Sequence, residues 1–224
     1  MDYLAQIKYY HSVCSGLKKR HIYCNLYNFK PRTGQDDALS AVKQFACDFI
    51  DNKNPVGLLL VGGVGSGKTY IAASLVNYLA DVMELYSCEE HSDEYIDLLK
   101  EDFSWLDKNT NVCFVVLSEL YEHLRYCYSN NDPWSPKRIM NHLREVDLLV
   151  LDDMGAEKTS DWTKEILFNI IDYRYNEQLP MLVTTNCIPE ELKEKIGDRN
   201  FDRLREMCAL VSVVATSQRE TAKL

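Results

Sequence analysis

Short apolar runs alternate with segments of helical periodicity along most of the chain. Five runs have the length of a strand, and they span residues 56–61, 112–117, 147–151, 181–185 and 209–214. Apolar residues at intervals of three and four predict helices over 36–51, 69–80, 118–128, 135–146, 160–177, 189–195 and 198–205. The third apolar run is apolar almost throughout, as expected of a strand buried on both faces of a parallel sheet. Strands that alternate with helices indicate a doubly wound α/β sheet.

A glycine-rich loop joins the first predicted strand to a helix and reads GxxxxGK[ST]. Glycines allow backbone N–H groups to turn inward, and the helix start adds its positive end, so the loop is suited to bind phosphate. We expect Lys68 to reach the β- and γ-phosphates and Thr69 to hold Mg²⁺. The expected nucleotide-binding residues are Gly62, Gly63, Val64, Gly65, Ser66, Gly67, Lys68, Thr69 and Tyr70.

Two carboxylates come directly after the third strand. A carboxylate at the end of an apolar strand needs a polar or charged partner to offset the cost of its burial. We therefore expect Asp152 to orient Mg²⁺ through the water molecules bound to the ion. Asp153 is a candidate to polarise the attacking water, and Glu157 is a second candidate for that task. A surface acid near a helix start is the alternative interpretation of Glu157.

The fourth strand and the C-terminal part of the chain supply further candidates. Asn186 follows the fourth strand and would lie beside the glycine loop if strands one and four are adjacent; an Asx turn is the alternative. Arg199 and Arg203 lie four residues apart on one helical face, so either suits an arginine finger that acts across a subunit boundary. Salt bridges within the helix are their alternative role. Arg219 is a candidate phosphate sensor, and a flexible tail is the alternative interpretation.

Composition and charge limit the class of protein. The chain has 224 residues, enough for one domain, and it has no apolar run near the ~20 residues of a membrane helix and no signal-peptide core. We therefore expect a cytoplasmic protein without a membrane partner. The net charge is −9, but residues 81–110 alone carry ten acidic residues and two lysines, a net of −8. A local basic face thus remains possible, although Lys137, Arg138 and Arg144 form only a weak cluster that a solvated face explains.

The eight cysteines are scattered and mostly lie inside apolar periods, which indicates small buried hydrophobes in a reducing compartment and not a disulfide framework. One arrangement has a spacing compatible with Zn²⁺, although zinc pairs are more usually CxxC. Its four candidate ligands are His11, Cys14, His21 and Cys24.

Four motifs in order carry a resemblance to a known family. The segments GGVGSGKT, LLVLDDMGAE, LVTTN and GDRNFDRLRE resemble those of AAA+ helicase loaders of the DnaC/DnaI type, and they are similar to those of the related IstB-type transposition ATPases. The likeness covers about residues 15–219. It implies a P-loop NTPase of the AAA+ class, with a three-layer α/β fold and a five-stranded parallel sheet in the order 5-1-4-3-2. It also implies a short lead-in over 1–34 and an ATPase core over 35–224 with an acidic insertion at about 81–110.

The resemblance implies a role for each candidate. Lys68 and Thr69 take the Walker A roles, Asp152 and Asp153 the Walker B roles, and Asn186 that of sensor 1. The arginine finger falls on Arg203 or Arg199, and Arg219 resembles the sensor 2 arginine. Three departures stand out. Walker B has Asp-Asp where many AAA+ enzymes have Asp-Glu, no glycine precedes Arg219 closely, and only about 30 residues precede the core.

Taken together, the residues and the resemblance predict an ATPase that binds ATP and Mg²⁺, self-associates and acts in DNA replication. The favoured function is loading of a replicative helicase onto single-stranded DNA. A transposition helper ATPase of the IstB type is the first alternative. A nucleotide-switched interaction module without a DNA role is the second.

Overall fold

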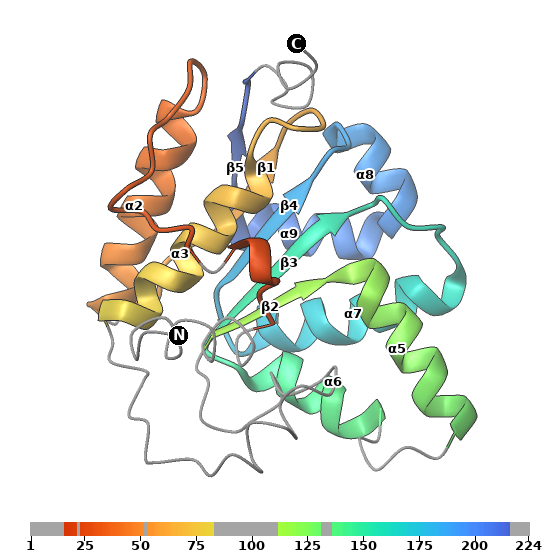
Figure 1. Cartoon of the computed structure of the whole chain (residues 1–224). Coiled ribbons are helices and arrows are strands. Elements are labelled where there is room, and N and C mark those ends of the chain that lie inside the picture. Colours follow the sequence, from red (N-terminus) through yellow and green to blue (C-terminus); the bar gives the residue numbers. More distant parts are fainter. Residues whose placement is uncertain (1–15, 22, 52, 83–111, 131–135, 216–224) are drawn as a thin grey trace, which may run out of the picture.

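A five-stranded sheet forms the centre of the protein (Figure 1). The computed structural model describes residues 16–21, 23–51, 53–82, 112–130 and 136–215. The strands are β1 (Gly57–Val61), β2 (Val112–Val116), β3 (Leu148–Met154), β4 (Met181–Thr185) and β5 (Cys208–Ser212). Their order is β2-β3-β4-β1-β5 and all neighbouring pairs are parallel, which is the predicted order 5-1-4-3-2 viewed from the other edge. The predicted fold class is therefore confirmed.

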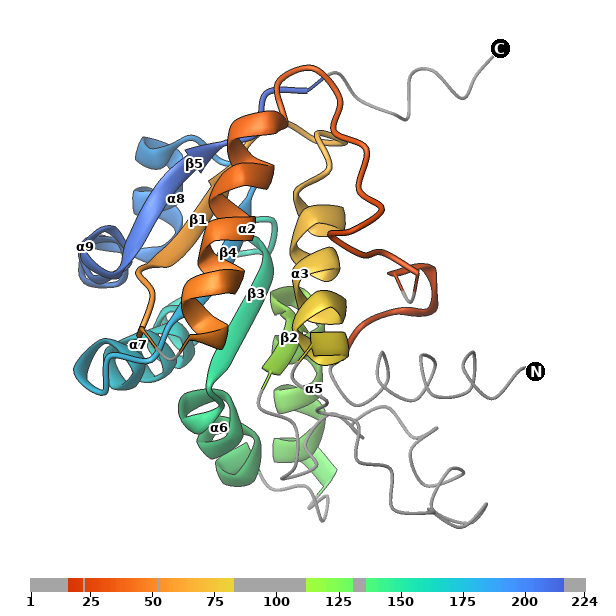
Figure 2. The ribbon, with the colours of Figure 1, turned by 90° about the vertical axis from the view of Figure 1, so that its left-hand side faces the viewer.

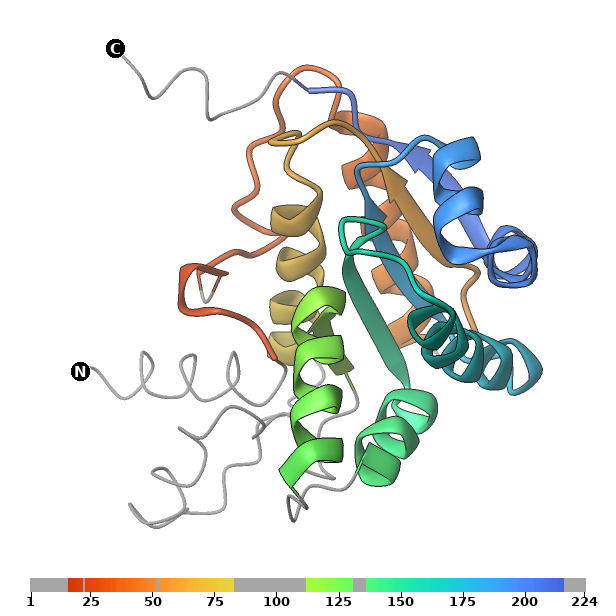
Figure 3. The ribbon, with the colours of Figure 1, turned by 90° about the vertical axis from the view of Figure 1, so that its right-hand side faces the viewer.

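Helices cover both faces of this sheet and complete three layers (Figures 2 and 3). The helical elements are η1 (Lys19–His21), α2 (Asp36–Ile50), α3 (Lys68–Val82), α5 (Leu117–Asn130), α6 (Pro136–Glu145), α7 (Asp161–Asn176), α8 (Pro189–Ile196) and α9 (Asp198–Met207). α2 and α3 pack on one face, and α5 to α9 pack on the other. α3 and α9 thus lie on opposite faces of the sheet.

The strand sequences explain why both faces are covered. In β1, Leu58 and Leu60 contribute to the core under α2 and α3, while Leu59 contributes to the core under α5 to α9. β3 and β4 alternate in the same way. Side chains of successive strand residues point to opposite faces, so an almost continuously apolar strand needs helices on both sides.

β3 is longer than predicted and contains both carboxylates. The expectation that Asp152 lies just past the strand was wrong, because Asp152 pairs with Val116 of β2 and the strand continues to Met154. Thr184 of β4 makes this possible. Its hydroxyl donates to Asp152 Oδ1 at 2.7 Å and accepts from the Asp153 N–H at 2.9 Å. The carboxylate of Asp152 and the N–H of Asp153 therefore have hydrogen-bond partners within the sheet.

Most predicted helices are confirmed, with small shifts at their ends. Ser160, the first residue of the helix predicted over 160–177, caps α7 through a capping box with Thr163. α9 continues to Met207 and β5 starts at the next residue. Ser135, the first residue of the helix predicted over 135–146, lies outside the described residues, as does the acidic insertion from residue 83 on.

Residues 16–35 pack on α3. Leu17, Cys24 and Leu26 are buried in the same core as α2 and α3. The Asn77 side-chain amide of α3 donates to the backbone carbonyls of His21 and Cys24 at 2.8 and 2.6 Å. This lead-in is thus held by apolar burial and by hydrogen bonds. None of the helices in the described ranges has the length and apolar character that a membrane span requires.

Candidate functional site

The glycine loop lies at the carboxyl end of β1 and leads into α3. Gly65 and Gly67 have φ angles of 79° and 98°, in the left-handed region that side chains disfavour. α3 begins at Lys68, and the first helical hydrogen bond runs from Ile71 N–H to the Gly67 carbonyl at 2.9 Å. The N–H groups at this helix start have no intrahelical partners, so the loop and the helix together form an anion-binding backbone.

Lys68 reaches back over the loop. Its ammonium donates to the carbonyls of Gly62 and Gly63 at 2.7 and 2.9 Å, and to Asn186 Oδ1 at 2.7 Å. Burial lowers the pKa of Lys68, while the charges of Asp153 and Asp152 act in the opposite direction. The predicted proximity of Asn186 to the loop therefore holds, because β4 pairs with β1 and ends beside it.

Thr69 and Asp152 face each other. The Thr69 hydroxyl lies 3.0 Å from Asp152 Oδ1 and 3.1 Å from Oδ2. Burial raises the pKa of Asp152, and the hydrogen bonds from Thr184 and Thr69 oppose that shift. A buried carboxylate of this kind gains from a nearby cation, and hydroxyl and carboxylate oxygens are ligands that Mg²⁺ prefers. Thr69 and Asp152 therefore fit a magnesium ion.

Asp153 is held next to this pair in an unusual backbone conformation. Its φ is 60°, which is uncommon for a residue other than glycine and is typical of functional positions. Asn186 Nδ2 donates to Asp153 Oδ1 at 2.6 Å, while the other amide atom of Asn186 accepts from Lys68. One asparagine thus connects the loop lysine with the carboxylate of β3.

Glu157 lies in the loop after β3. It accepts a hydrogen bond from the Gly155 N–H at 3.2 Å. Burial raises its pKa, and the negative charge of Asp153 raises it further. Its surroundings differ from those of an ordinary surface acid, and Glu157 remains a candidate to bind the proton of a water molecule.

Two residues that the sequence did not single out support the loop from its outer side. Gln35 Nε2 donates to the Ser66 carbonyl at 2.6 Å, and Arg32 Nη2 donates to the Gly65 carbonyl at 3.3 Å. Gln35 is 2% exposed and also accepts from the Arg32 N–H at 2.8 Å. Their position before a predicted helix gave no local signal of a contact with a loop about 30 residues away.

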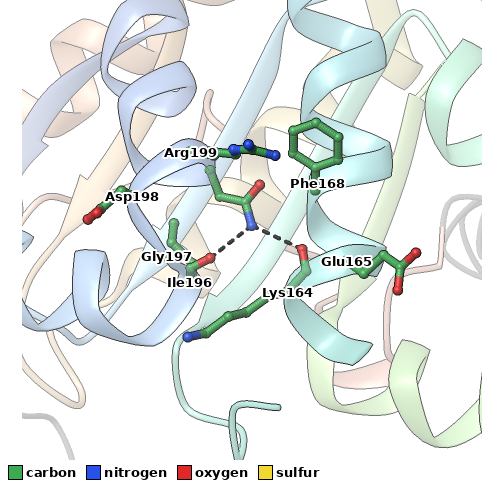
Figure 4. A pocket seen from close by; sticks show the side chains of 8 residues that line it. Lys164, Glu165, Phe168, Ile196, Gly197, Asp198 and Arg199 are labelled. Atoms are coloured by element: carbon green, nitrogen blue, oxygen red, sulfur yellow. Dashed lines mark hydrogen bonds between the residues drawn. The ribbon is translucent and has the colours of Figure 1, made fainter. Parts of the chain in front are cut away.

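The arginine candidates lie away from this site, on α9. Arg203 Nη2 pairs with Asp172 Oδ1 of α7 at 2.5 Å, and its guanidinium carbon lies 4.9 Å from the centre of the Phe168 ring. Arg199 is exposed and lines a pocket of about 380 Å³ between α7 and the turn from α8 to α9, with Phe168 and Ile196 (Figure 4). The structure therefore does not bring Arg199 or Arg203 to the glycine loop of their own chain.

The remaining candidates are scattered. Val64 and Tyr70 are exposed on the loop and the first turn of α3. Lys137 and Arg138 are exposed on α6, while Arg144 donates to the Asn169 carbonyl. Arg219 lies outside the described residues. So do His11 and Cys14 of the zinc hypothesis, whereas His21 and Cys24 are buried, and the described residues contain no group of three or more metal-ligating side chains.

Comparisons with known proteins give consistent matches. A family model described as IstB-like ATP binding protein matches residues 105–224. The replicative helicase loader DnaC of Escherichia coli strain K12 is 26% identical over 192 residues, which cover 85% of this chain and 66% of that protein. The chain thus spans slightly less than two thirds of the length of this relative.

Solved structures share the fold. A crystal structure of the DnaC helicase loader superposes with a TM-score of 0.64 at 24% identity, covering 87% of this chain and 99% of that one. A crystal structure of DnaI superposes with a TM-score of 0.65 at 21% identity, covering 91% of this chain and 94% of the DnaI chain. At these identities the likeness shows the three-layer fold.

Proposed function

The chain belongs to the family of IstB-like ATP binding proteins, and we propose that it is an ATPase that loads a replicative helicase onto single-stranded DNA. The observation that carries the ATPase part of this proposal is the convergence of Lys68 and Thr69 with Asp152 and Asn186 at one edge of the sheet. These residues come from three different strands or strand ends. They combine an anion-binding loop with a carboxylate suited to a metal and a polar side chain beside both.

ATP would be bound by the glycine loop, with its phosphates on the N–H groups of the loop and of the start of α3. Lys68 would bind the β- and γ-phosphates, since its ammonium already lies over the loop. Thr69 and Asp152 would hold Mg²⁺, which supplies positive charge to the triphosphate. Asn186 contacts both Lys68 and Asp153, so it would set the position of the γ-phosphate relative to the carboxylate.

Hydrolysis requires a group that accepts a proton from water. Asp153 lies between Asn186 and the Thr184 hydroxyl and is the first candidate. Glu157 is the second, because its raised pKa brings it closer to the value that favours proton transfer near neutral pH. Exchange of each carboxylate for its amide separates the two: the base is the residue whose amide variant loses turnover while ATP affinity is kept.

Completion of the site would require a second copy of the chain. Arg199 and Arg203 lie on α9, on the face opposite α3, and either would act on the nucleotide of a neighbouring subunit. A mixing experiment tests this. Lys68→Ala chains and Arg203→Ala chains should each be inactive alone and should regain part of the activity when mixed. If they do not, Arg199→Ala is the next variant to test.

The helicase and DNA parts of the proposal rest on the relatives, since replicative helicase loaders are among the curated proteins that match. The direct experiment measures unwinding of a forked DNA by the host replicative helicase, with single-stranded DNA-binding protein present, on adding this chain. Stimulation that requires ATP and is lost in Lys68→Ala supports the proposal.

Two other outcomes would favour the alternatives. ATP-dependent stimulation of a transposase, without an effect on the helicase, would assign the chain to transposition, as the IstB-like family model allows. ATP binding without hydrolysis and without any response to DNA would favour a nucleotide-switched interaction module.

A further inference from the structure

Gln35 is the side chain that holds the glycine loop most closely from outside. It directly precedes α2, is 2% exposed, and makes no side-chain capping bond to that helix. Instead its amide nitrogen donates to the Ser66 carbonyl at 2.6 Å. Its amide oxygen accepts from the Arg32 N–H at 2.8 Å, so the orientation of the amide is fixed by both ends.

This contact determines which way one peptide unit of the loop faces. The Ser66 carbonyl and the Gly67 N–H belong to the same peptide, and the described residues contain no cis peptide bond. In a planar trans peptide the C=O and N–H point in opposite directions. Because Gln35 draws the carbonyl outward, the Gly67 N–H points inward, and it has no acceptor among the described residues.

The glycine at position 67 fits the same contact. A Cβ built on Gly67 would lie 2.5 Å from Gln35 Nε2, which is closer than non-bonded atoms can approach. Gly67 also has a φ of 98°, a conformation that side chains rarely adopt, and a Cβ at this position would displace the Gln35 amide. The Gln35 amide and the bare α-carbon of Gly67 therefore form one packed unit.

We propose that Gln35 is a positioning residue for phosphate binding: it holds the Ser66–Gly67 peptide so that the Gly67 N–H faces the nucleotide. The inference rests on the proposed nucleotide site and adds to it the residue that directly precedes α2. Through Arg32 and Gln35, the way residues 16–35 pack on α3 is coupled to the shape of the glycine loop.

Nucleotide affinity of the full chain, measured by titration with ATP and with ADP, tests this. Gln35→Ala should weaken both affinities about tenfold, the loss expected when one well-formed hydrogen bond in the site is removed. Gln44→Ala is the matched control, because Gln44 is an exposed glutamine of α2 whose side chain donates to Asp48 and lies away from the loop. It should leave both affinities unchanged.

Gln35→Glu distinguishes this positioning role from a general loss of stability, because only the positioning role predicts a nucleotide affinity that depends on the protonation of residue 35. At neutral pH the introduced carboxylate cannot donate a hydrogen bond and repels the Ser66 carbonyl, so the nucleotide affinity should fall further than in Gln35→Ala. As the pH is lowered and the carboxyl gains a proton, it can donate again, and the affinity relative to wild type should recover.

Affinities of Gln35→Ala within twofold of wild type, or a Gln35→Glu ratio that does not change with pH, would overturn the inference. If Gln35→Ala does not fold, the pH dependence of Gln35→Glu decides. Lys68→Ala separates this failure from failure of the nucleotide site: unchanged ATP affinity in that variant would reject the site itself.

Discussion

Two buried cations lie at opposite ends of the sheet and differ in what surrounds them. Arg174 is 0% exposed and lies at the amino ends of β3 and β4. Its guanidinium donates to five backbone carbonyls, those of Leu143, Arg144, Val146, Asp147 and Pro180. Lys68 is 5% exposed and lies at the carboxyl ends of β1 and β4.

Burial lowers the pKa of both groups, to about 9 for Arg174, so both cost free energy to keep charged. The difference lies in their partners. The partners of Arg174 are main-chain atoms before two strands, which the fold fixes in place. Lys68 contacts loop carbonyls and the exposed side chain of Asn186, and it lies near two carboxylates. A buried cation bound only by fixed carbonyls stabilises the fold, whereas one among movable polar groups is suited to bind a ligand.

Replacement of Arg174 by methionine should give the largest effect. The change keeps much of the volume but leaves five carbonyls without their donor, so we expect the free energy of unfolding to fall by about 3 kcal/mol or more. Urea unfolding followed by circular dichroism measures this. Arg205→Met, at an exposed position of α9, is the control and should change stability by less than about 0.5 kcal/mol. Equal stabilities of the two variants would contradict the structural role of Arg174.

Replacement of Asn186 by alanine should affect turnover more than stability. The variant breaks the connection between Lys68 and Asp153 at the reacting phosphate, so we expect kcat for ATP hydrolysis to fall about 30-fold, or about 2 kcal/mol. The ATP dissociation constant should change less than threefold. Asn176→Ala, at the exposed end of α7, should leave kcat unchanged. A drop in affinity without a drop in kcat would assign Asn186 to binding alone.

The smallest effect concerns the lead-in and depends on pH. Burial lowers the pKa of His21 from 6.5 to about 4, with Arg20 and Lys18 adding to the shift. The unfolded chain therefore gains a proton near pH 6.5, while the folded chain does so only near pH 4, and stability falls as pH decreases through this window. At pH 5.5 the loss from this group is about 1 kcal/mol.

A His21→Phe variant lacks this titration and isolates it from the carboxylates. The free energy of unfolding of wild type should fall more steeply than that of the variant between pH 7 and pH 5. Parallel pH profiles would show that His21 is not buried in its neutral form.

The sequence predicted those parts of the site that follow from local pattern. The glycine loop lies between a strand and a helix in the sequence itself, and Asp152 and Asn186 follow from the rule that parallel strands end at the same edge of a sheet. The fold followed from the alternation of apolar runs and helical periods. Several ends were shifted, and the end of β3 mattered most because the bonds from Thr184 to this part of β3 cross between strands.

Contacts between distant segments could not be predicted in this way. Gln35 is a polar residue before a helix, and only the packing of α2 and the lead-in brings it to Ser66. Arg174 lies in a helix rich in polar residues and resembles a surface residue in the sequence, yet it is fully buried. The contacts of Gln35 and of Arg174 both depend on which backbone carbonyls the tertiary structure leaves without a partner. The pattern of apolar and polar residues in the sequence carries no information about those carbonyls.

The central claim is that Lys68, Thr69 and Asp152 form one site for a nucleotide and its metal. Calorimetric titration of the wild-type chain, Lys68→Ala and Asp152→Asn with ATP, each with and without Mg²⁺, tests it most directly. The account predicts that Lys68→Ala weakens ATP binding at least 100-fold under both conditions. Asp152→Asn should bind ATP alone about as well as wild type, without the gain that Mg²⁺ gives. Wild-type affinity in Lys68→Ala, or an undiminished Mg²⁺ effect in Asp152→Asn, would contradict it.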